Sequence, residues 1–133
     1  MAIVKTVLVN DGGAPSRIIN FTAGEALEAG EALKVHTDGT VKLATSNQAP
    51  VLGFALTDTA NGDVASVVTG RGIVINAITD GVSAGDLLSV DSAKPGFLET
   101  KTAYADGTEE DVVVAIALED NSTTDTMTKI MVL

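Results

Sequence analysis

The sequence predicts an all-β protein, built as a small single-domain β-barrel or sandwich with an internal repeat and an N-terminal strand or arm. Three observations support this fold class. Apolar and polar residues alternate in short runs, turn signals recur at roughly the 8–12-residue spacing typical of such folds, and no segment has a convincing amphipathic helical period. We therefore expect less than about a tenth of the chain to be helical, against a typical third.

The N-terminal segment reads as two strands joined by a turn. Residues 3–9 are rich in β-branched side chains, the Asn-Asp-Gly-Gly run at residues 10–13 is a strong turn signal, and residues 17–21 fit a returning strand. Residues 1–21 are thus expected to form an arm or hairpin, ahead of a single β domain over residues 22–133.

Residues 22–34 are the one serious helix candidate. Thr22 and Glu25 have the spacing of a capping box, and the Ala, Leu and Glu residues that follow favour helix. Gly24 and Gly30 oppose a long helix, since each costs about 1 kcal/mol relative to alanine. We predict turns and a short strand here, with one helical turn allowed.

An internal repeat organises the rest of the chain. The pattern Ala-Gly-acid-x-Leu-x-Val occurs at residues 29–35 and again at residues 84–90. Glycine permits a tight turn, the acid can accept a hydrogen bond from a turn amide, and Leu and Val then share one face of a strand. Apolar segments at residues 51–56 and 113–118 also correspond. Two related halves, about residues 28–68 and 83–133, are expected to share one core.

The remaining elements follow from local patterns. Residues 64–68 and 73–78 fit strands, Thr79-Asp80-Gly81 fits a turn, and residues 104–111 form a polar, acidic loop. Residues 112–118 are almost wholly apolar, as in a strand buried on both faces, and the last strand is expected over residues 127–133. The predicted core contains Leu33, Val35, Phe54, Leu56, Val74, Leu88, Val90, Val114, Ile116 and Leu118.

Composition limits the classes of partner. The chain has 133 residues, the size of one domain, and its formal net charge is −10 from 18 acids and 8 bases. Such a surface repels nucleic acid and anionic lipid, so neither is an expected partner. We expect a soluble protein, because no apolar run approaches membrane-span length and the start of the chain lacks a secretory signal pattern.

The residues of common catalytic and cofactor sites are missing from the sequence. There is no cysteine, His36 is the single histidine, and neither a Gly-x-Ser-x-Gly elbow nor a phosphate-binding glycine loop is present. We therefore expect no enzymatic activity and no cofactor. Oxygen ligands for a structural Ca²⁺ remain possible in two acidic turns without EF-hand spacing, one with Asp58, Asn61 and Asp63, the other with Asp120, Asn121 and Asp125.

Residues 82–94 are similar to the hairpin of lipoyl and biotinyl carrier domains, in which a Gly-Asp turn precedes a strand and a lysine at the tip is modified. Here Lys94 comes one residue early and Pro95 follows it. A one-residue slip reverses the face that a strand residue takes, and proline changes the tip geometry. These two departures count against a carrier, and a carrier module with Lys94 at the tip is kept as the alternative interpretation.

The order of features from residue 10 to residue 99 resembles that of capsid cement proteins of tailed bacteriophages, also called head decoration proteins. An Asp-Gly turn at residues 11–12 precedes a strand ending in Phe21. Ala-Gly-Glu at 29–31, Leu-Gly-Phe-Ala-Leu at 52–56, Asn-Gly-Asp-Val at 61–64, a glycine-rich strand entry at 70–74 and Ser-Ala-Gly-Asp at 83–86 follow. The similarity covers about two-thirds of the chain, and residues 100–133 depart most from it.

This resemblance implies a structural virion protein that binds the outer surface of a phage capsid and stabilises the shell against internal pressure, without catalysis. It implies the major capsid protein as partner and a homo-oligomer, with a trimer favoured. Another structural β-module of a phage particle, from a tail or fibre, is the further alternative.

The N-terminal strand is the expected capsid-binding segment. It carries one lysine and no acid in an otherwise acidic chain, and an extended segment can add to an exposed sheet edge through main-chain hydrogen bonds. An ordinary internal strand is an equal alternative. The candidate residues are Ile3, Val4, Lys5, Thr6, Val7, Leu8 and Val9.

Overall fold

The protein is all-β in the computed structural model, which describes residue 7, residues 16–101 and residues 112–133. The described residues form ten strands and no helix, which confirms the predicted fold class. The strands are β1 (Arg17–Thr22), β2 (Ala32–Val35), β3 (Val41–Leu43), β4 (Gly53–Ala55), β5 (Val64–Thr69), β6 (Val74–Val82), β7 (Leu87–Val90), β8 (Leu98–Thr100), β9 (Ala115–Ala117) and β10 (Asn121–Val132).

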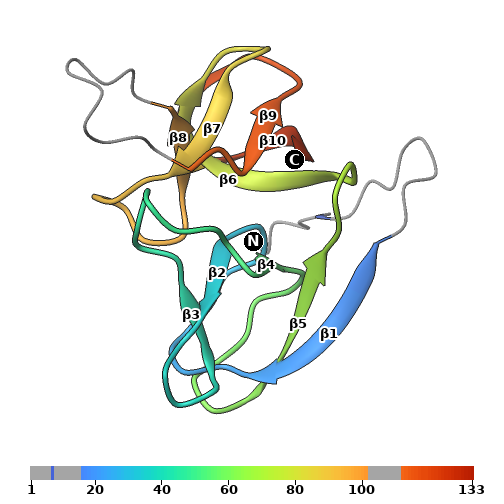
Figure 1. Cartoon of the computed structure of the whole chain (residues 1–133), viewed down its shortest axis with the longest axis vertical. Helices are drawn as coiled ribbons and strands as arrows, with labels where there is room; N and C mark the ends of the chain where they lie inside the picture. Colours follow the sequence, from blue (N-terminus) through green and yellow to red (C-terminus); the bar gives the residue numbers. More distant parts are fainter. Residues whose placement is uncertain (1–6, 8–15, 102–111) are drawn as a thin grey trace, which may run out of the picture.

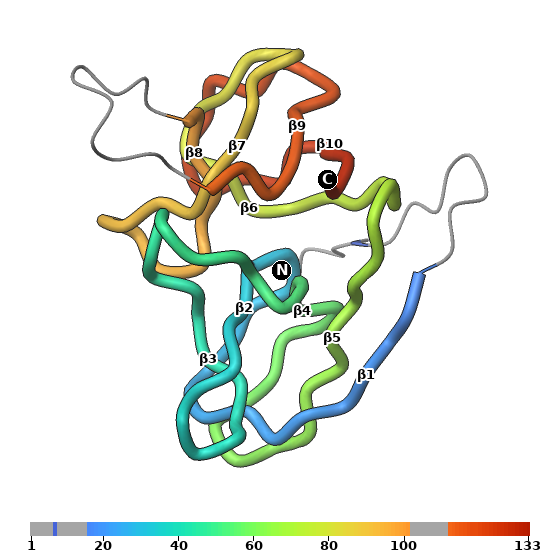
Figure 2. Tube along the Cα trace, in the orientation of Figure 1, coloured from blue at the N-terminus to red at the C-terminus, as the bar shows by residue number. Residues whose placement is uncertain are grey.

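The strands make two five-stranded sheets. The first has the order β1-β5-β4-β2-β3, and the second is a closed barrel with the order β10-β6-β8-β7-β9. Figure 1 shows the barrel at one end of the molecule and the open sheet at the other, and the trace in Figure 2 passes between them where β5 leads into β6. The barrel closes through a parallel pair, in which Thr79 of β6 lies opposite Leu98 of β8.

The two sheets repeat one topology. Adding five to each strand number of the first sheet gives β6-β10-β9-β7-β8, which is the order around the barrel. We call β1–β5 the first half and β6–β10 the second half. The parallel closing pair also has a counterpart, since Ala23 and Val41 form an isolated parallel bridge in the first half.

Strand register fixes which residues are equivalent. Phe54 lies opposite Val68 across β4 and β5, and Ile116 lies opposite Met131 across β9 and β10. The turn before β2 is also duplicated: the Gly30 N–H donates to the Ala55 carbonyl at 2.8 Å, as the Gly85 N–H does to the Ala117 carbonyl. Every equivalence used below follows from these registers.

The acid of the repeated motif closes its turn, as the sequence pattern predicts. Glu31 Oε1 accepts a hydrogen bond from the Glu28 N–H at 2.6 Å, and Asp86 Oδ2 accepts one from the Ser83 N–H at 2.9 Å. The glycine before each acid has a φ of 88° or 87°, a conformation that side chains disfavour. Each turn thus delivers its strand into the sheet by the same local device.

The core consists of two clusters. One lies inside the first half and contains Ala23, Leu27, Leu33, Val41, Ala55, Ala65 and Val67. The other fills the barrel and continues between the halves, where Phe54 and Val68 of the first half join Ile73, Ile75, Leu88, Val114 and Ile130 of the second. The two halves are therefore held together by a shared apolar core.

Two of the ten predicted core residues, Val35 and Leu118, are exposed, at 51% and 42%. Leu118 follows β9, whose inward side chains are Ala115 and Ala117. A five-stranded barrel has a narrow interior, so the small residues face inward and the larger Ile116 and Leu118 face outward. Val35 ends β2 beside the 36–40 turn, where no described residue covers it.

The predicted turn at Thr79-Asp80-Gly81 is also wrong, because β6 runs straight through it. Gly81 has a φ of 73°, and the opposite strand β10 shifts register on either side of Thr124. Such bulges let a strand continue past a residue with unusual backbone angles. β10 consequently begins at Asn121, well before the predicted residue 127, and takes in the second predicted acidic turn.

Residues 22–34 contain no helix, which confirms the predicted turns and short strand: Ala23 and Leu27 make isolated bridges, and β2 begins at Ala32. Other boundaries differ from prediction for local reasons. The apolar run over residues 112–118 forms a strand only over Ala115–Ala117. The acidic loop at 104–111 and most of the predicted arm lie outside the described residues. β1 is part of the first sheet, and the division into an arm over residues 1–21 and a domain over residues 22–133 stays a prediction.

Candidate contact surface

Val7 is the one described residue of the predicted capsid-binding segment, and it lies in the core. Its side chain is 2% exposed, and its carbonyl accepts a hydrogen bond from the Asn76 N–H of β6 at 2.7 Å. Ile3, Val4, Lys5, Thr6, Leu8 and Val9 lie outside the described residues. Val7 therefore anchors this segment to the outer edge of β6, and capsid binding by its neighbours stays a prediction.

Lys94, the candidate carrier lysine, is engaged in a polar cluster. Its Nζ lies 2.9 Å from Asp80 Oδ1 and 3.0 Å from Thr124 Oγ1, and sits above the Phe97 ring. The hydrogen bond to Asp80 raises the pKa of Lys94. Hydrogen bonds from Thr124 and then Lys94 lower the pKa of the Asp80 carboxyl. This lysine holds the tip of the β7–β8 connection against β6 and β10.

The acidic turns use their carboxylates for main-chain hydrogen bonds. Asp58 Oδ1 accepts from the Ala29 N–H, and the equivalent Asp120 Oδ1 accepts from the Ala84 N–H, both at 2.8 Å. Within the described part of the chain, no three His, Cys, Asp or Glu side chains are grouped as a metal site. These acids thus have a structural task, and their spacing gives Ca²⁺ binding no further support.

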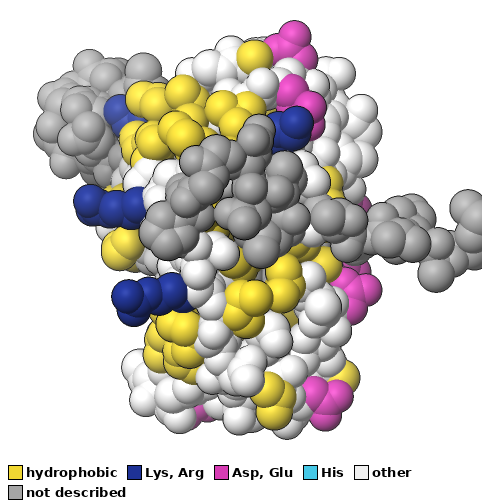
Figure 3. Space-filling view, turned by 90° about the vertical axis from the view of Figure 1, so that its right-hand side faces the viewer, with side chains coloured by type: hydrophobic (Ala, Val, Ile, Leu, Met, Phe, Trp, Pro, Cys, Tyr) yellow, Lys and Arg dark blue, Asp and Glu magenta, His cyan; other side chains and the backbone are white. Residues whose placement is uncertain are grey.

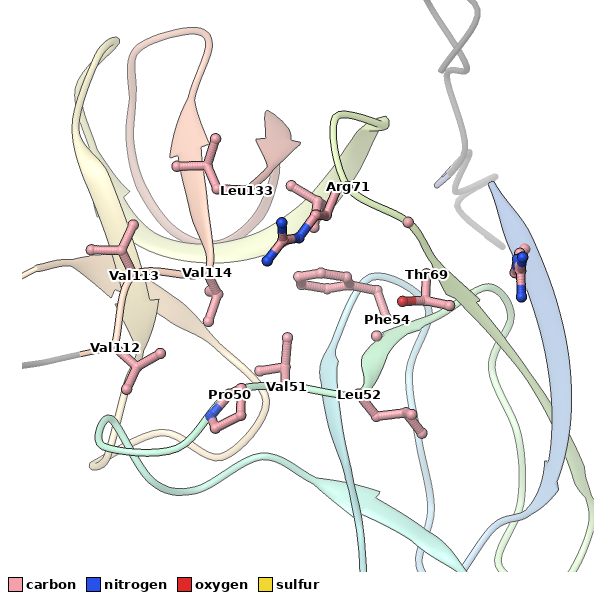
Figure 4. A pocket seen from close by; sticks show the side chains of 14 residues that line it. Pro50, Val51, Leu52, Phe54, Thr69, Arg71, Val112, Val113, Val114 and Leu133 are labelled. Atoms are coloured by element: carbon pink, nitrogen blue, oxygen red, sulfur yellow. The ribbon is translucent and has the colours of Figure 1, made fainter. Parts of the chain in front are cut away.

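A groove of about 390 Å³ lies between the two halves. Its wall is mostly apolar and includes Val51, Phe54, Val114 and Leu133; Arg17 and Arg71 are the charged residues that line it. Figure 4 shows Val51, Phe54 and Val114 directed into the space between the sheets, with the Arg71 guanidinium reaching toward it. The buried side-chain nitrogen and oxygen atoms of the described residues all have hydrogen-bond partners.

An apolar row crosses the outside of the barrel above this groove. Leu87 lies opposite Ile116 and Ile116 opposite Met131, so three neighbouring strands present apolar side chains in register; Val74, opposite Met131 on the fourth strand, is buried. Leu87 is 43% exposed, and the nearby Leu118 and Leu133 are similarly open. Figure 3 shows apolar side chains gathered over the barrel end of this side of the molecule. A large exposed apolar area of this kind marks a contact with another surface.

Sequence reasoning missed this outer row. The doublet Leu87-Leu88 carried the signal, because neighbouring residues of a strand point to opposite faces and one leucine must therefore face outward. Leu88 is fully buried in the barrel, and Leu87 is the outward one.

The described residues contain no helix that could cross a bilayer.

The comparisons with known proteins identify the fold. No protein-family profile and no curated protein sequence matches the chain. Among solved structures, the chain is similar to the head fiber gp8.5 N base of bacteriophage phi29, with a TM-score of 0.66 and 16% sequence identity over 90% of this chain and 95% of that one. The chain therefore has the fold of that phage head fiber base.

Proposed function

We propose that the protein is a structural component of a phage virion that attaches to the outer surface of the head. The observation that carries this proposal is the likeness to the phi29 head fiber base over nearly the full length of both chains. The groove between the halves supplies a contact surface, and the described residues contain no group of three His, Cys, Asp or Glu side chains that could hold a metal ion. We propose a structural and not an enzymatic role.

Charge favours the outside of the shell. The interior of a filled head is packed with DNA, whose phosphates repel a protein of net charge −10. At roughly 0.15 M salt the screening length is about 8 Å, so this repulsion acts near contact. Binding to the major capsid protein is then driven by apolar and main-chain contacts, and it tolerates or gains from moderate salt.

Two roles fit an outer attachment. A cement protein reinforces the shell against internal pressure, whereas a fibre base anchors a projecting structure and need not reinforce it. The family resemblance of the sequence favours cement, and the solved structure favours a fibre base. We propose a homo-oligomer in either case, with a trimer favoured, because the exposed edge of β1 and the apolar row call for cover.

The carrier alternative finds no support at Lys94. A modified lysine must swing freely at a hairpin tip, but this one is paired with Asp80 and held over Phe97. Intact-mass analysis of the protein from its natural source tests the point, because a carrier would show a lipoyl or biotinyl adduct on Lys94.

Head binding is tested by adding the purified protein to intact, DNA-filled particles that lack it, followed by sedimentation at low and high salt. We expect saturable binding that does not weaken as salt rises. Binding only to opened shells, or binding to free DNA that falls steeply with salt, would contradict outer attachment. Heating the particles separates the two roles, since cement raises the temperature of DNA release and a fibre base leaves it unchanged.

A further inference from the structure

The interface between the two halves uses one surface from each. From the first half comes the outer face of β2 and β4 with the turn before β2, which we call the face; it includes Gly30, Ala32, Phe54 and Leu56. From the second half comes the outer edge of β6 with β10 and the β7–β8 turn, which we call the edge; it includes Asn76, Ile78, Gly96 and Met127.

Main-chain hydrogen bonds join the face of the first half to the edge of the second. The Ile78 N–H donates to the Gly30 carbonyl at 2.9 Å, and the Ala32 N–H donates to the Gly96 carbonyl at 2.8 Å. Packing is close at both glycines: a Cβ on Gly30 would lie 3.0 Å from Met127 Cε, and one on Gly96 would lie 3.1 Å from the Glu31 side chain.

Because the halves repeat one topology, each also carries the other surface, and these two copies are open with respect to residues 16–101 and 112–133. The second half has a face with Gly85, Leu87, Ile116 and Leu118, equivalent to Gly30, Ala32, Phe54 and Leu56. The first half has an edge with Asn20, Thr22, Gly39 and Val64, equivalent to Asn76, Ile78, Gly96 and Met127. A Cβ on Gly85 or on Gly39 would have no described atom within 4 Å.

Several exposed apolar residues lie at positions whose counterparts in the other half are covered. Val64, 67% exposed, is equivalent to Met127, which packs on the inter-half core. Leu87, 43% exposed, is equivalent to the fully buried Ala32. The same holds for Ile19 against Ile75, Val35 against Val90, and Leu118 against Leu56, since the second member of each pair is buried or packed on that core.

Side-chain sizes differ between the open and the closed surfaces. The open face has a larger residue than the closed one where Leu87 replaces Ala32, and a smaller one where Ile116 replaces Phe54. The open edge has smaller residues than the closed one where Thr22 replaces Ile78 and Val64 replaces Met127. The directions of the backbone N–H groups also fit this docking. The Ala23 N–H donates to the Asp63 carbonyl beside β5. Because successive N–H groups of an antiparallel strand point to opposite sides, those of Asn20 and Thr22 point away from β5.

We propose that the open face of one copy of this chain docks on the open edge of a second copy, repeating between molecules the interface that joins the halves within one. The interface is head-to-tail, so each subunit gives its face to one neighbour and its edge to another. Such an interface closes into a ring when its rotation permits. It specifies the subunit contact of the homo-oligomer proposed above, and it forms without a capsid.

The test uses one substitution on each surface, Leu87→Arg on the face and Val64→Arg on the edge. Sedimentation velocity of the wild-type chain is expected to show an oligomer at micromolar concentration. A charge at the centre of an apolar contact should weaken association about 30-fold or more, so each variant alone should be monomeric. Ala60→Arg and Ser122→Arg are matched controls, because these two residues are equivalent and both exposed; they should associate like the wild type.

Mixing the two monomeric variants separates a head-to-tail contact from a two-fold one. The Val64→Arg chain keeps a sound face and the Leu87→Arg chain keeps a sound edge, so the mixture should form dimers and stop there. A two-fold interface would stay broken in the mixture. The proposal is overturned by a monomeric wild type, by variants that associate normally, or by a mixture that stays monomeric.

Leu118→Arg and Thr22→Arg repeat the experiment with a second pair on the same two surfaces, and circular dichroism checks the fold of each variant. If these association experiments contradict the subunit contact, the proposal of head binding still stands, because head binding is measured separately by sedimentation with particles.

Discussion

Thr79 and Thr128 show how a single polar pair distinguishes the two halves. Both side chains are fully buried in the barrel and share a hydrogen bond, and Asn121 Nδ2 donates to Thr128 Oγ1 at 3.0 Å. The equivalent positions in the first half are Ala23 and Ala65, both buried. The site therefore accepts either an apolar pair or a bonded polar pair.

A double-mutant cycle on this pair is expected to be strongly non-additive. Thr79→Val removes one of the two hydrogen-bond partners of the Thr128 hydroxyl and leaves only Asn121, which should lower the free energy of unfolding by about 1–3 kcal/mol. Replacing both threonines should cost less than the sum of the two single changes, because no hydroxyl is then stranded. Urea denaturation measures the cycle, and additive effects would contradict this account of the pair.

The Asp80–Lys94 pair gives stability a defined pH window. The folded-state pKa of Asp80 lies below its ordinary value of 3.8, so its contribution is present above that value and is lost as pH falls through the folded-state pKa. The pKa of Lys94 lies above 10.5, so its contribution is present below that value and is lost as pH rises beyond it.

Asp80→Asn should accordingly lower the Tm at pH 7, and its deficit relative to the wild type should shrink below about pH 3.8. Thermal melts of both proteins from pH 3 to 7 measure the difference, and Asp63→Asn, at an exposed turn in the first half, serves as a control. A deficit that stays constant across this range would show that the loss is not electrostatic.

At the scale of elements, the equivalent strands β4 and β9 differ in the space that they leave for a side chain at one equivalent position. A Cβ on Gly53 of β4 would lie 2.5 Å from the Val68 carbonyl oxygen and 2.8 Å from Val67 Cγ1, whereas β9 carries Ala115 at the equivalent position. β5 thus runs closer to β4 than β10 does to β9.

Gly53→Ala should destabilise the protein by about 1–3 kcal/mol, because the added methyl forces the strands apart. The matched change Ala115→Gly removes a methyl from the same place in the other half and should cost about 1 kcal/mol. Chemical denaturation of both variants makes the comparison. A neutral Gly53→Ala would mean that β4 and β5 are not held this closely in solution.

The N-terminal segment can be tested without disturbing its anchor. Deleting residues 1–6 leaves Val7, whose carbonyl bonds Asn76, so the chain should fold and associate normally. If this segment binds the capsid, the truncated protein no longer sediments with heads. Full head binding by the truncation would exclude Ile3, Val4, Lys5 and Thr6 as the capsid contact.

The repeat, the fold class and the two motif turns could be predicted because they depend on local signals. Glycine before an acid, with Leu and Val two residues apart, specifies the turn and the strand after it. The exposure of Val35 and Leu118 could not be predicted, because it depends on which surface of each half packs against the other half. Pattern alone gives Val35 and Val90 the same status, yet only Val90 is buried and belongs to the core cluster shared by the two halves. The bulges that carry β6 through Gly81 likewise depend on the partner strand β10.

At the scale of the molecule, the duplicated unit explains why so much apolar surface is exposed on an acidic protein. One face–edge contact is satisfied within the chain and the other is open, while the groove between the halves lies beside the open face. Acids are spread over the rest of the surface and keep free molecules apart in solution. An oligomer that covers the open surfaces can then present its remaining apolar area and the groove to a capsid.

Electron microscopy of the particle tests the central claim most directly. DNA-filled heads that lack the protein are imaged before and after its addition at about 0.15 M salt. The account predicts new density outside the shell, into which the ten-stranded chain fits with its acidic loops away from the capsid. Density inside the shell, or unchanged heads at saturating protein, would contradict attachment to the outer surface of the head.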